Sequence, residues 1–132
     1  PYTSGSGVTG TCKPDASLEK YFVDDYSNVP ANSVSQLKAA IAQQPVSVTI
    51  EADKLPFQLY KSGILDSTAC GTNLDHAVAA VGYGSENGED YYIVRNSWGK
   101  SWGEQGYVRI AAVDGAGICG IQKQSLWPTA KN

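Results

Sequence analysis

The sequence contains a single histidine, His76, and only three cysteines, and both shortages limit its chemistry. The three cysteines are widely spaced, without a Cys-x-x-Cys pair, so the pattern disfavours zinc and we expect no metal site. An odd number of cysteines leaves at least one outside any internal disulfide. Cys70 and Cys119 both lie beside glycine in loop-like sequence and could pair, which would leave Cys12 alone.

Long apolar runs and an excess of basic residues are also absent. No run approaches the roughly 20 residues of a transmembrane helix, so we expect no membrane partner. The net charge of −3 argues against nucleic acid, because phosphate binding needs clustered Lys and Arg. Apolar content of 42% over 132 residues is typical of one globular domain. The chain starts at Pro1 without an initiator Met or a signal peptide, so we expect a processed mature form or a piece of a longer protein.

Sequence patterns predict one helix and several strands. Ser33 and Gln36 have the spacing of a capping box, and an apolar stripe over 34–41 predicts an amphipathic helix that ends before Pro45. Alternation predicts strands at 19–26, 46–50, 107–111 and 121–127, with Pro128 closing the last, a single helical turn at 57–60, and a turn at Gly82-Tyr83-Gly84. Residues 28–31 break the pattern, at Pro30, and we take this stretch as the domain boundary.

A β-hairpin is predicted in the middle of the chain. Asn87-Gly88 is the pair favoured in a two-residue type I′ turn, because both central residues need positive φ. This turn would fold residues 91–96 back antiparallel to residues 75–81 and bring Asn96 near His76. One helix followed by about five strands with short connections predicts an antiparallel sheet or partly closed barrel with a helix packed on it.

His76 and Asn96 form a candidate catalytic pair. A lone histidine is more often structural, satisfied by a backbone carbonyl. However, an asparagine side chain can accept an imidazole N–H and so set the tautomer and the ring plane. Trp98 could cover that hydrogen bond and keep water away from it. Trp98 and Trp102 taken alone are more often core residues than catalytic ones, and the glycines between them indicate a tight loop.

Two long segments resemble a known family. L-D-H-A-V-A-A-V-G-Y-G at 74–84 and R-N-S-W-G-K-S-W-G-E-Q-G-Y-V-R-I at 95–110 resemble the histidine and asparagine regions of papain-like cysteine peptidases. The segments 43–52 and 57–64, together with the C-G-I and L-W-P near the end of the chain, resemble the same family in the same order. The string Asn-Ser-Trp-Gly-x-x-Trp-Gly is highly specific, and the resemblance covers essentially the whole chain.

The resemblance implies an α+β, papain-like fold. Residues 28–132 would form the β-rich half-domain, an antiparallel barrel-like sheet with a packed helix that carries the histidine and the asparagine. Residues 1–27 would be a remnant of the helical half-domain. The family resemblance also pairs Cys70 with Cys119, and it pairs Cys12 with a cysteine in a part of the enzyme that this chain lacks.

The resemblance also implies roles for individual residues. His76 would be the general base and imidazolium partner, Asn96 would orient it, Trp98 would shield their hydrogen bond, and Trp102 would pack beside the leaving-group side. The residues implied to bind substrate are Leu74, Asp75, Ala77, Thr49 and Gln124, of which Gln124 would lie near the floor of the pocket.

The family's nucleophile is missing from the chain. It lies in a Cys-Gly-[Ser/Ala]-Cys-[Trp/Tyr] segment roughly 130–150 residues before the histidine and asparagine, and no cysteine here has that context. We therefore expect the C-terminal three-fifths of a papain-like enzyme, inactive alone, whose N-terminal half-domain supplies the thiol and the partner of Cys12.

The resemblance implies a function for the parent protein. It would be a secreted or lysosomal/vacuolar endopeptidase that hydrolyses peptide and protein substrates without a cofactor. The alternative is an isolated fragment, or a non-catalytic relative that serves as a binding or storage protein. Retention of His76, Asn96 and Trp98 argues against a decayed relative, because a dead homologue has no chemical need for that set.

Overall fold

The computed structural model describes residues 4–15, 17 and 22–131 of the 132-residue chain. In this part of the chain, a seven-stranded sheet has the order β1-β7-β2-β4-β5-β6-β3, and only the β3–β6 pair is parallel. The strands are β1 (Phe22–Asn28), β2 (Val46–Ile50), β3 (Ile64–Leu65), β4 (His76–Glu86), β5 (Glu89–Arg95), β6 (Tyr107–Ala111) and β7 (Ser125–Lys131). The helices are α1 (Val34–Ile41), α2 (Leu55–Gln58) and two short 3-10 helices, η1 (Thr68–Cys70) and η2 (Ile118–Gly120).

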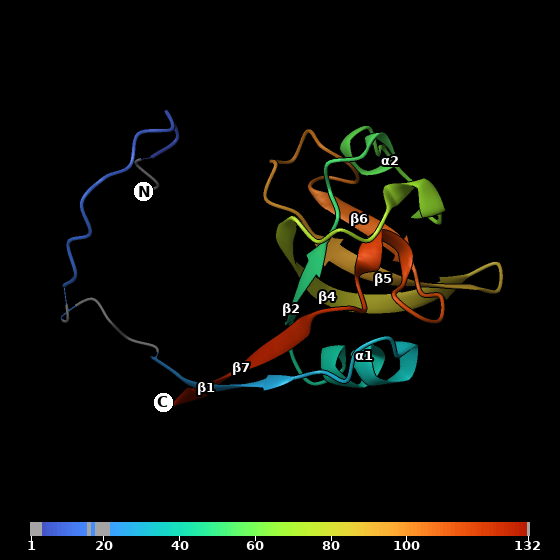
Figure 1. The fold of residues 1–132 in the computed structure, drawn as a ribbon, viewed down its shortest axis with the longest axis horizontal. Coiled ribbons are helices and arrows are strands. Elements are labelled where there is room, and N and C mark those ends of the chain that lie inside the picture. The colour runs from blue at the N-terminus through green and yellow to red at the C-terminus, as the bar shows by residue number, and fades with distance from the viewer. Residues whose placement is uncertain (1–3, 16, 18–21, 132) are drawn as a thin grey trace.

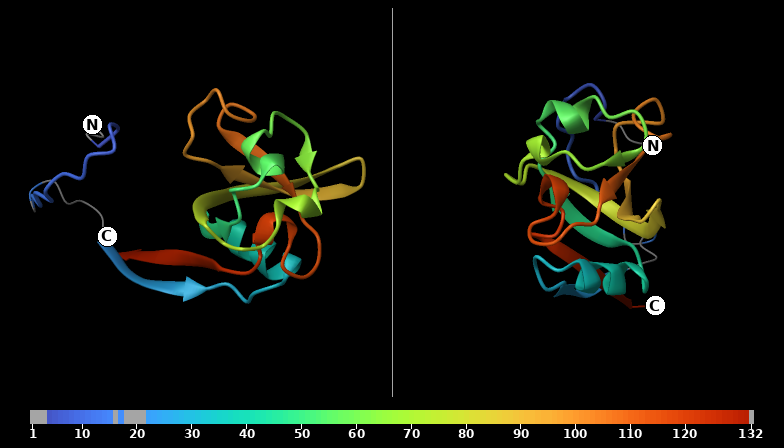
Figure 2. Two further views of the ribbon diagram at one scale, coloured as in Figure 1. Left: turned by 45° about the horizontal axis from the view of Figure 1, so that its top comes forward. Right: turned by 90° about the vertical axis from the view of Figure 1, so that its right-hand side faces the viewer.

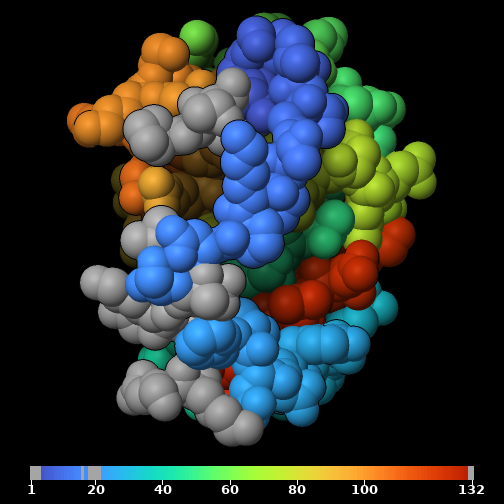
Figure 3. All heavy atoms as spheres, turned by 90° about the vertical axis from the view of Figure 1, so that its left-hand side faces the viewer, coloured from blue at the N-terminus to red at the C-terminus, as the bar shows by residue number. Residues whose placement is uncertain are grey.

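The sheet is strongly curved, and α1 packs beside it (Figures 1 and 2). Strands β1 and β7 form a two-stranded ribbon that reaches away from the body, and residues 4–15 extend beyond that ribbon (Figure 1). The same segment, in blue, faces the viewer in Figure 3. The predicted fold class, an antiparallel sheet with a packed helix, is confirmed. Within the described residues, no helix is long and apolar enough to cross a membrane.

Helix α1 has the bounds that its apolar stripe predicts. The Ser33 Oγ accepts the Gln36 N–H at 3.3 Å, which is the first half of the predicted capping box. Leu37, Ala40 and Ile41 are buried against the sheet. Because a helix of two turns is marginal by itself, this buried face supplies most of its stability.

The core lies inside the curve of the sheet. Strand β2 alternates as predicted, with Val46, Val48 and Ile50 fully buried and Ser47 exposed. Apolar side chains from the other elements complete the core, among them Phe57, Tyr92, Val94, Val108, Ile110 and Ile121. Strand β2 is therefore held from both sides, by β4 and by β7.

The central hairpin forms as predicted, but its first strand is longer. Asn87 and Gly88 both have positive φ, 53° and 84°, as a type I′ turn requires. The turn predicted at 82–84 is wrong, because β4 continues to Glu86. A Cβ on Gly84 would lie 2.7 Å from the Tyr91 hydroxyl, so the glycine gives the cross-strand ring room to lie over the strand.

Two other predicted boundaries are also wrong. The last strand begins at Ser125, four residues after its predicted start at residue 121, because Ile121 lies in the turn after η2. Pro128 does not close it, since β7 continues to Lys131. At Pro128 the strand pairs with β1, whereas its pairing with β2 is confined to Ser125 and Leu126, so that edge needs no N–H from the proline.

Smaller differences occur at two further elements. Helix α2 begins two residues earlier than the predicted turn at 57–60, because Pro56 fits the first turn, where its missing N–H is not needed. The strand predicted at 19–26 is confirmed from Phe22 onwards, while residues 19–21 lie outside the described residues. The short β3, which pairs in parallel with β6, was not predicted because two residues carry no periodic signal.

A disulfide joins Cys70 and Cys119, as the family resemblance implied, and it ties η1 to η2. Replacing both cysteines by alanine is expected to lower the free energy of unfolding by about 4 kcal/mol, because the bond closes a loop across 49 residues. Urea titration measures the change. Cys12→Ala, which removes an exposed free thiol, is the control and should leave the free energy unaltered. A non-reducing peptide map that joined Cys12 to either partner would contradict the pairing.

Candidate active site

The central hairpin brings His76 and Asn96 into contact. His76 is the first residue of β4, and Asn96 follows Arg95, the last residue of β5. The His76 Nε2 lies 2.9 Å from the Asn96 Oδ1. The sequence prediction that these two side chains meet therefore agrees with the geometry, although their roles in chemistry remain proposals.

The orientation of the Asn96 amide follows from its second hydrogen bond. Asn96 is 7% exposed, and its Oδ1 also accepts the Ser97 N–H at 2.8 Å. Because Oδ1 accepts from both sides, Nε2 of His76 must carry the proton. The Nδ1 of His76 has no hydrogen-bond partner among the described residues, so the neutral ring presents a free lone pair there. The Asn96 Nδ2 is buried without a partner in the same part of the chain.

Aromatic rings surround this hydrogen bond. The Trp98 ring lies 5.3 Å from the His76 ring, centroid to centroid, at an interplanar angle of 31°. Phe57 is fully buried beneath both rings, 5.4 Å from Trp98 and 6.4 Å from His76, in edge-to-face geometry. Trp102 lies 4.9 Å from Phe57, and its Nε1 donates to the Gln58 carbonyl at 3.2 Å.

Phe57 is a site residue that sequence reasoning missed. The family resemblance includes its segment, and the sequence predicts a helical turn there, but neither implies a role for this side chain. The only local signal was one large aromatic residue in a short turn, which is equally typical of any core. Its position under the His76–Trp98 pair arises from the packing of α2 against the loop after β5.

A glycine and an ion pair hold the loop between β5 and β6, residues 96–106, which carries Trp98 and Trp102. Gly103 has φ of +55°, and a Cβ there would lie 2.5 Å from the Tyr107 carbonyl oxygen, so no side chain fits. The Arg109 guanidinium binds both oxygens of Glu104, at 3.0 and 2.8 Å, and this hydrogen bonding lowers the pKa of Glu104. Burial raises the pKa of Tyr60, whose hydroxyl donates to the Gly63 carbonyl beside this pair.

The five residues implied to bind substrate lie around the end of β2. Thr49 and Ala77 are a cross-strand pair, and the Thr49 N–H donates to the Gln124 carbonyl at 3.1 Å. The Asp75 carboxylate accepts the Ala52 N–H at 2.7 Å. Leu74 packs against Gly120: a Cβ added to Gly120 would lie 2.9 Å from the Leu74 Cδ2. The structure thus brings these residues together, and their part in substrate binding remains a prediction.

An open hollow of about 260 Å³ lies beside the histidine. Its lining residues are Ala52, Asp53, Gln58, Asp75, His76 and Trp98. Within the described residues, no three His, Cys, Asp or Glu side chains lie close enough to hold a metal ion. The arrangement can therefore do acid–base chemistry at the imidazole, with an oriented ring at the edge of an accessible hollow.

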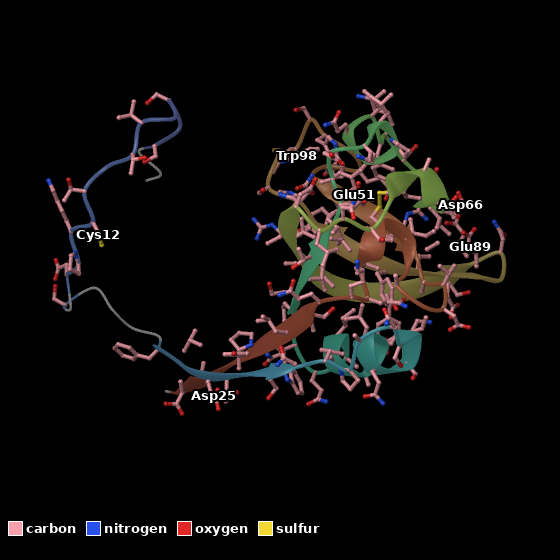
Figure 4. All side chains as sticks on the ribbon, viewed as in Figure 1. Cys12, Asp25, Glu51, Asp66, Glu89 and Trp98 are labelled. Carbon is pink, nitrogen blue, oxygen red and sulfur yellow. A yellow bond between two sulfur atoms is a disulfide. The ribbon has the colours of Figure 1, made fainter. Side chains whose placement is uncertain are left out.

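None of the chain's own cysteines is placed to be a nucleophile beside His76. Cys70 and Cys119 are bonded to each other and buried. Cys12 is exposed and lies on the extended N-terminal segment, far from the labelled Trp98 in Figure 4. The described part of the chain therefore holds the histidine and the asparagine of the site without a thiol.

Comparisons with known proteins agree with this geometry. A model of the papain family of cysteine proteases matches residues 1–129. Germination-specific cysteine protease 1 of Arabidopsis thaliana is 56% identical over 109 residues, which are 80% of this chain and 29% of that protein. Chymopapain of Carica papaya is 50% identical over 111 residues, which are 83% of this chain and 31% of that protein.

A solved structure extends the likeness to the fold. The bromelain protease of Ananas comosus, in complex with an inhibitor, superimposes with a TM-score of 0.85 and 43% identity, covering 98% of this chain and 59% of that one. The chain spans about a third or less of the length of the curated relatives it matches, at 29% and 31%. The fold is papain-like, and these relatives are cysteine proteases. The chain therefore belongs to the papain family of cysteine proteases.

Proposed function

We propose that this chain supplies the histidine and asparagine half of the active site of a papain-like cysteine endopeptidase. The observation that carries the proposal is the 2.9 Å hydrogen bond between the His76 Nε2 and the Asn96 Oδ1, next to the Trp98 ring. This bond leaves the Nδ1 lone pair of His76 free to take the proton of a thiol. Membership of the papain family supports the same reading.

We propose that the thiol belongs to an N-terminal half-domain of the same enzyme. Residues 1–27 would be a remnant of that half-domain and residues 28–132 the β-rich half. The exposed apolar side chains of β1, which pairs with β7, support the presence of such a half-domain, since Phe22, Val23 and Tyr26 are 55%, 70% and 59% exposed. Apolar surface of this kind marks a face that a further part of the protein covers. Cys12, exposed and free here, would pair with a cysteine in that half-domain.

In the proposed mechanism, His76 takes the proton of the thiol, and the resulting imidazolium stabilises the thiolate. The thiolate attacks the peptide carbonyl, and His76 returns the proton to the leaving amine. Water then hydrolyses the thioester. The Asn96 Oδ1 keeps the ring plane constant through both proton transfers, and Trp98 limits the access of water to that hydrogen bond. The substrate would lie along Leu74, Asp75, Ala77, Thr49 and Gln124.

The proposed setting of the enzyme is secreted or lysosomal/vacuolar. Disulfides persist in oxidising compartments, and the chain contains the Cys70–Cys119 bond. In the alternative, the chain is an isolated fragment or a non-catalytic relative that serves in binding or storage. One measurement separates the two proposals. Intact mass near the 14.0 kDa of this chain would indicate that it acts alone, whereas an enzyme with the half-domain would be heavier.

In the full-length enzyme, Asn96→Ala should lower kcat by about 100-fold with little change in stability, because it releases the imidazole from its orientation. Trp98→Ala should lower both kcat and stability, the latter by about 1–3 kcal/mol, because the ring packs on Phe57 but is 41% exposed. Peptide-hydrolysis kinetics and thermal unfolding measure the two effects. Glu89→Ala, at the exposed start of β5, is the control. Equal thermal destabilisation with normal turnover per folded molecule would favour a structural role.

Residues 1–132 expressed alone should hydrolyse no peptide, because His76 has no thiol to activate. The assay uses a generic peptide substrate, with the full-length enzyme as the positive control and a thiol-specific inhibitor in a parallel reaction. Turnover by the short chain that the inhibitor abolishes would mean that one of its own cysteines is the nucleophile, and the proposed source of the thiol would be wrong.

A further inference from the structure

Glu51 is a buried carboxylate that the proposed chemistry does not use. It is 1% exposed and follows Ile50, the last residue of β2 and the cross-strand partner of His76. Figure 4 shows it in the centre of the body, beside the disulfide, and its N–H donates to the Cys119 carbonyl at 2.8 Å. Burying a charge is costly unless it is paired and hydrogen-bonded, so its partners indicate what it does.

The carboxylate has two partners on different segments. Its Oε1 lies 3.1 Å from the Lys54 Nζ, at the surface end of the side chain. Its Oε2 accepts the backbone N–H of Asn73, in the segment between the disulfide and His76. The Oε2 atom, which points into the protein, therefore binds the backbone of the segment formed by residues 70–75.

Gly71 makes this arrangement possible. Its φ is +76°, and a Cβ at this position would lie 2.2 Å from the Glu51 Oε2. No other residue could follow Cys70 without displacing the carboxylate. The backbone of the segment is thus shaped around the Glu51 side chain.

Neighbouring residues of the segment are tied to other elements. The disulfide holds Cys70, and the Thr72 carbonyl accepts the Lys123 Nζ at 2.8 Å. The Asp75 N–H donates to the Ile50 carbonyl at 3.0 Å. Between these ties, the Glu51 carboxylate holds Asn73, which immediately precedes Leu74. The backbone on the two sides of Leu74 is therefore held by two hydrogen bonds, from Asn73 to Glu51 and from Asp75 to Ile50.

We propose that Glu51 is a positioning residue for substrate binding. Its carboxylate holds Asn73 and so sets the position of Leu74, which would line the substrate pocket; this inference rests on the proposed function. Glu51 itself is buried and does not touch the substrate. His76 is oriented separately, by Asn96 after the end of β5, so loss of Glu51 affects substrate binding more than the chemical step.

The test compares Glu51→Leu, Glu51→Gln and Glu89→Leu in the full-length enzyme. E51L should raise KM roughly tenfold, since small displacements of binding groups are costly, while kcat stays within about twofold. Its melting temperature should fall by a few degrees, because the Asn73 N–H loses its acceptor, while Lys54 is 45% exposed and stays in contact with water. E51Q keeps an oxygen acceptor for the Asn73 N–H, so the KM of this variant should lie within about threefold of the wild-type value. E89L removes an exposed charge far from Glu51 in Figure 4 and should match wild type.

Gly71→Ala is the second variant, in case E51L does not fold. It keeps the carboxylate but places a methyl group against it, and KM should rise as in E51L. A wild-type KM in either folded variant overturns the proposal. A fall in kcat that follows only the folded fraction, with KM unchanged, also overturns it by making Glu51 merely structural.

Hydrogen exchange separates this inference from the proposed function. If the wild-type enzyme hydrolyses no peptide, the proposed function fails, but the positioning of the segment can still be measured. E51L should speed amide exchange in residues 72–75 by about tenfold, with E89L unchanged, because local opening no longer breaks the Glu51–Asn73 bond. Unchanged exchange in this segment would overturn the role of Glu51 independently of any activity.

Discussion

The register of the β4–β5 hairpin is the constraint on which the rest of the site depends. The two-residue turn pairs Glu86 with Glu89, but at the far end Ala79 pairs with Arg95, because a bulge between Ala80 and Gly82 inserts one extra residue into β4. That displacement determines which residue beyond β5 faces His76. A slip of one residue would turn the side chains to opposite faces and separate the histidine from Asn96.

The second requirement is a rigid support beneath the hydrogen bond. Phe57 fills the space under His76 and Trp98, and Trp102 packs against its other side. These rings come from α2 and from the loop after β5, and Phe57 lies 41 residues before Trp98 in the sequence. Their contacts restrict the plane of the imidazole ring in addition to its hydrogen bond with Asn96.

The third feature is the dense bonding of the segment that leads into β4. The disulfide, the Lys123 contact, Glu51 and the end of β2 all act on 70–75. A loop with so many ties is typical of a binding surface carried on a rigid scaffold. The combination of a firmly held loop and an oriented histidine is consistent with a half-site that gains its function when the thiol-bearing half packs beside it.

Local signals in the sequence determined much of this protein. The apolar stripe predicted α1, alternation predicted β2 and β6, and Asn87-Gly88 predicted the turn. The string Asn-Ser-Trp-Gly-x-x-Trp-Gly identified Asn96 as the candidate partner of His76. These features depend on short-range periodicity, backbone dihedral preferences or side-chain chemistry, which neighbouring residues specify.

Tertiary structure decided the rest. β4 runs through Gly82 and Gly84 because the facing strand packs its side chains over them, and a Cβ would lie 3.3 Å from the Ile93 Cδ1 and 2.7 Å from the Tyr91 hydroxyl. β7 passes Pro128 because, among the described residues, its pairing with β2 ends at Leu126, so no N–H is needed from the proline. The burial of Glu51 and the position of Phe57 depend on contacts with residues at least 19 positions away in the sequence. Such contacts arise only when distant segments pack, so no local pattern in the sequence could specify them.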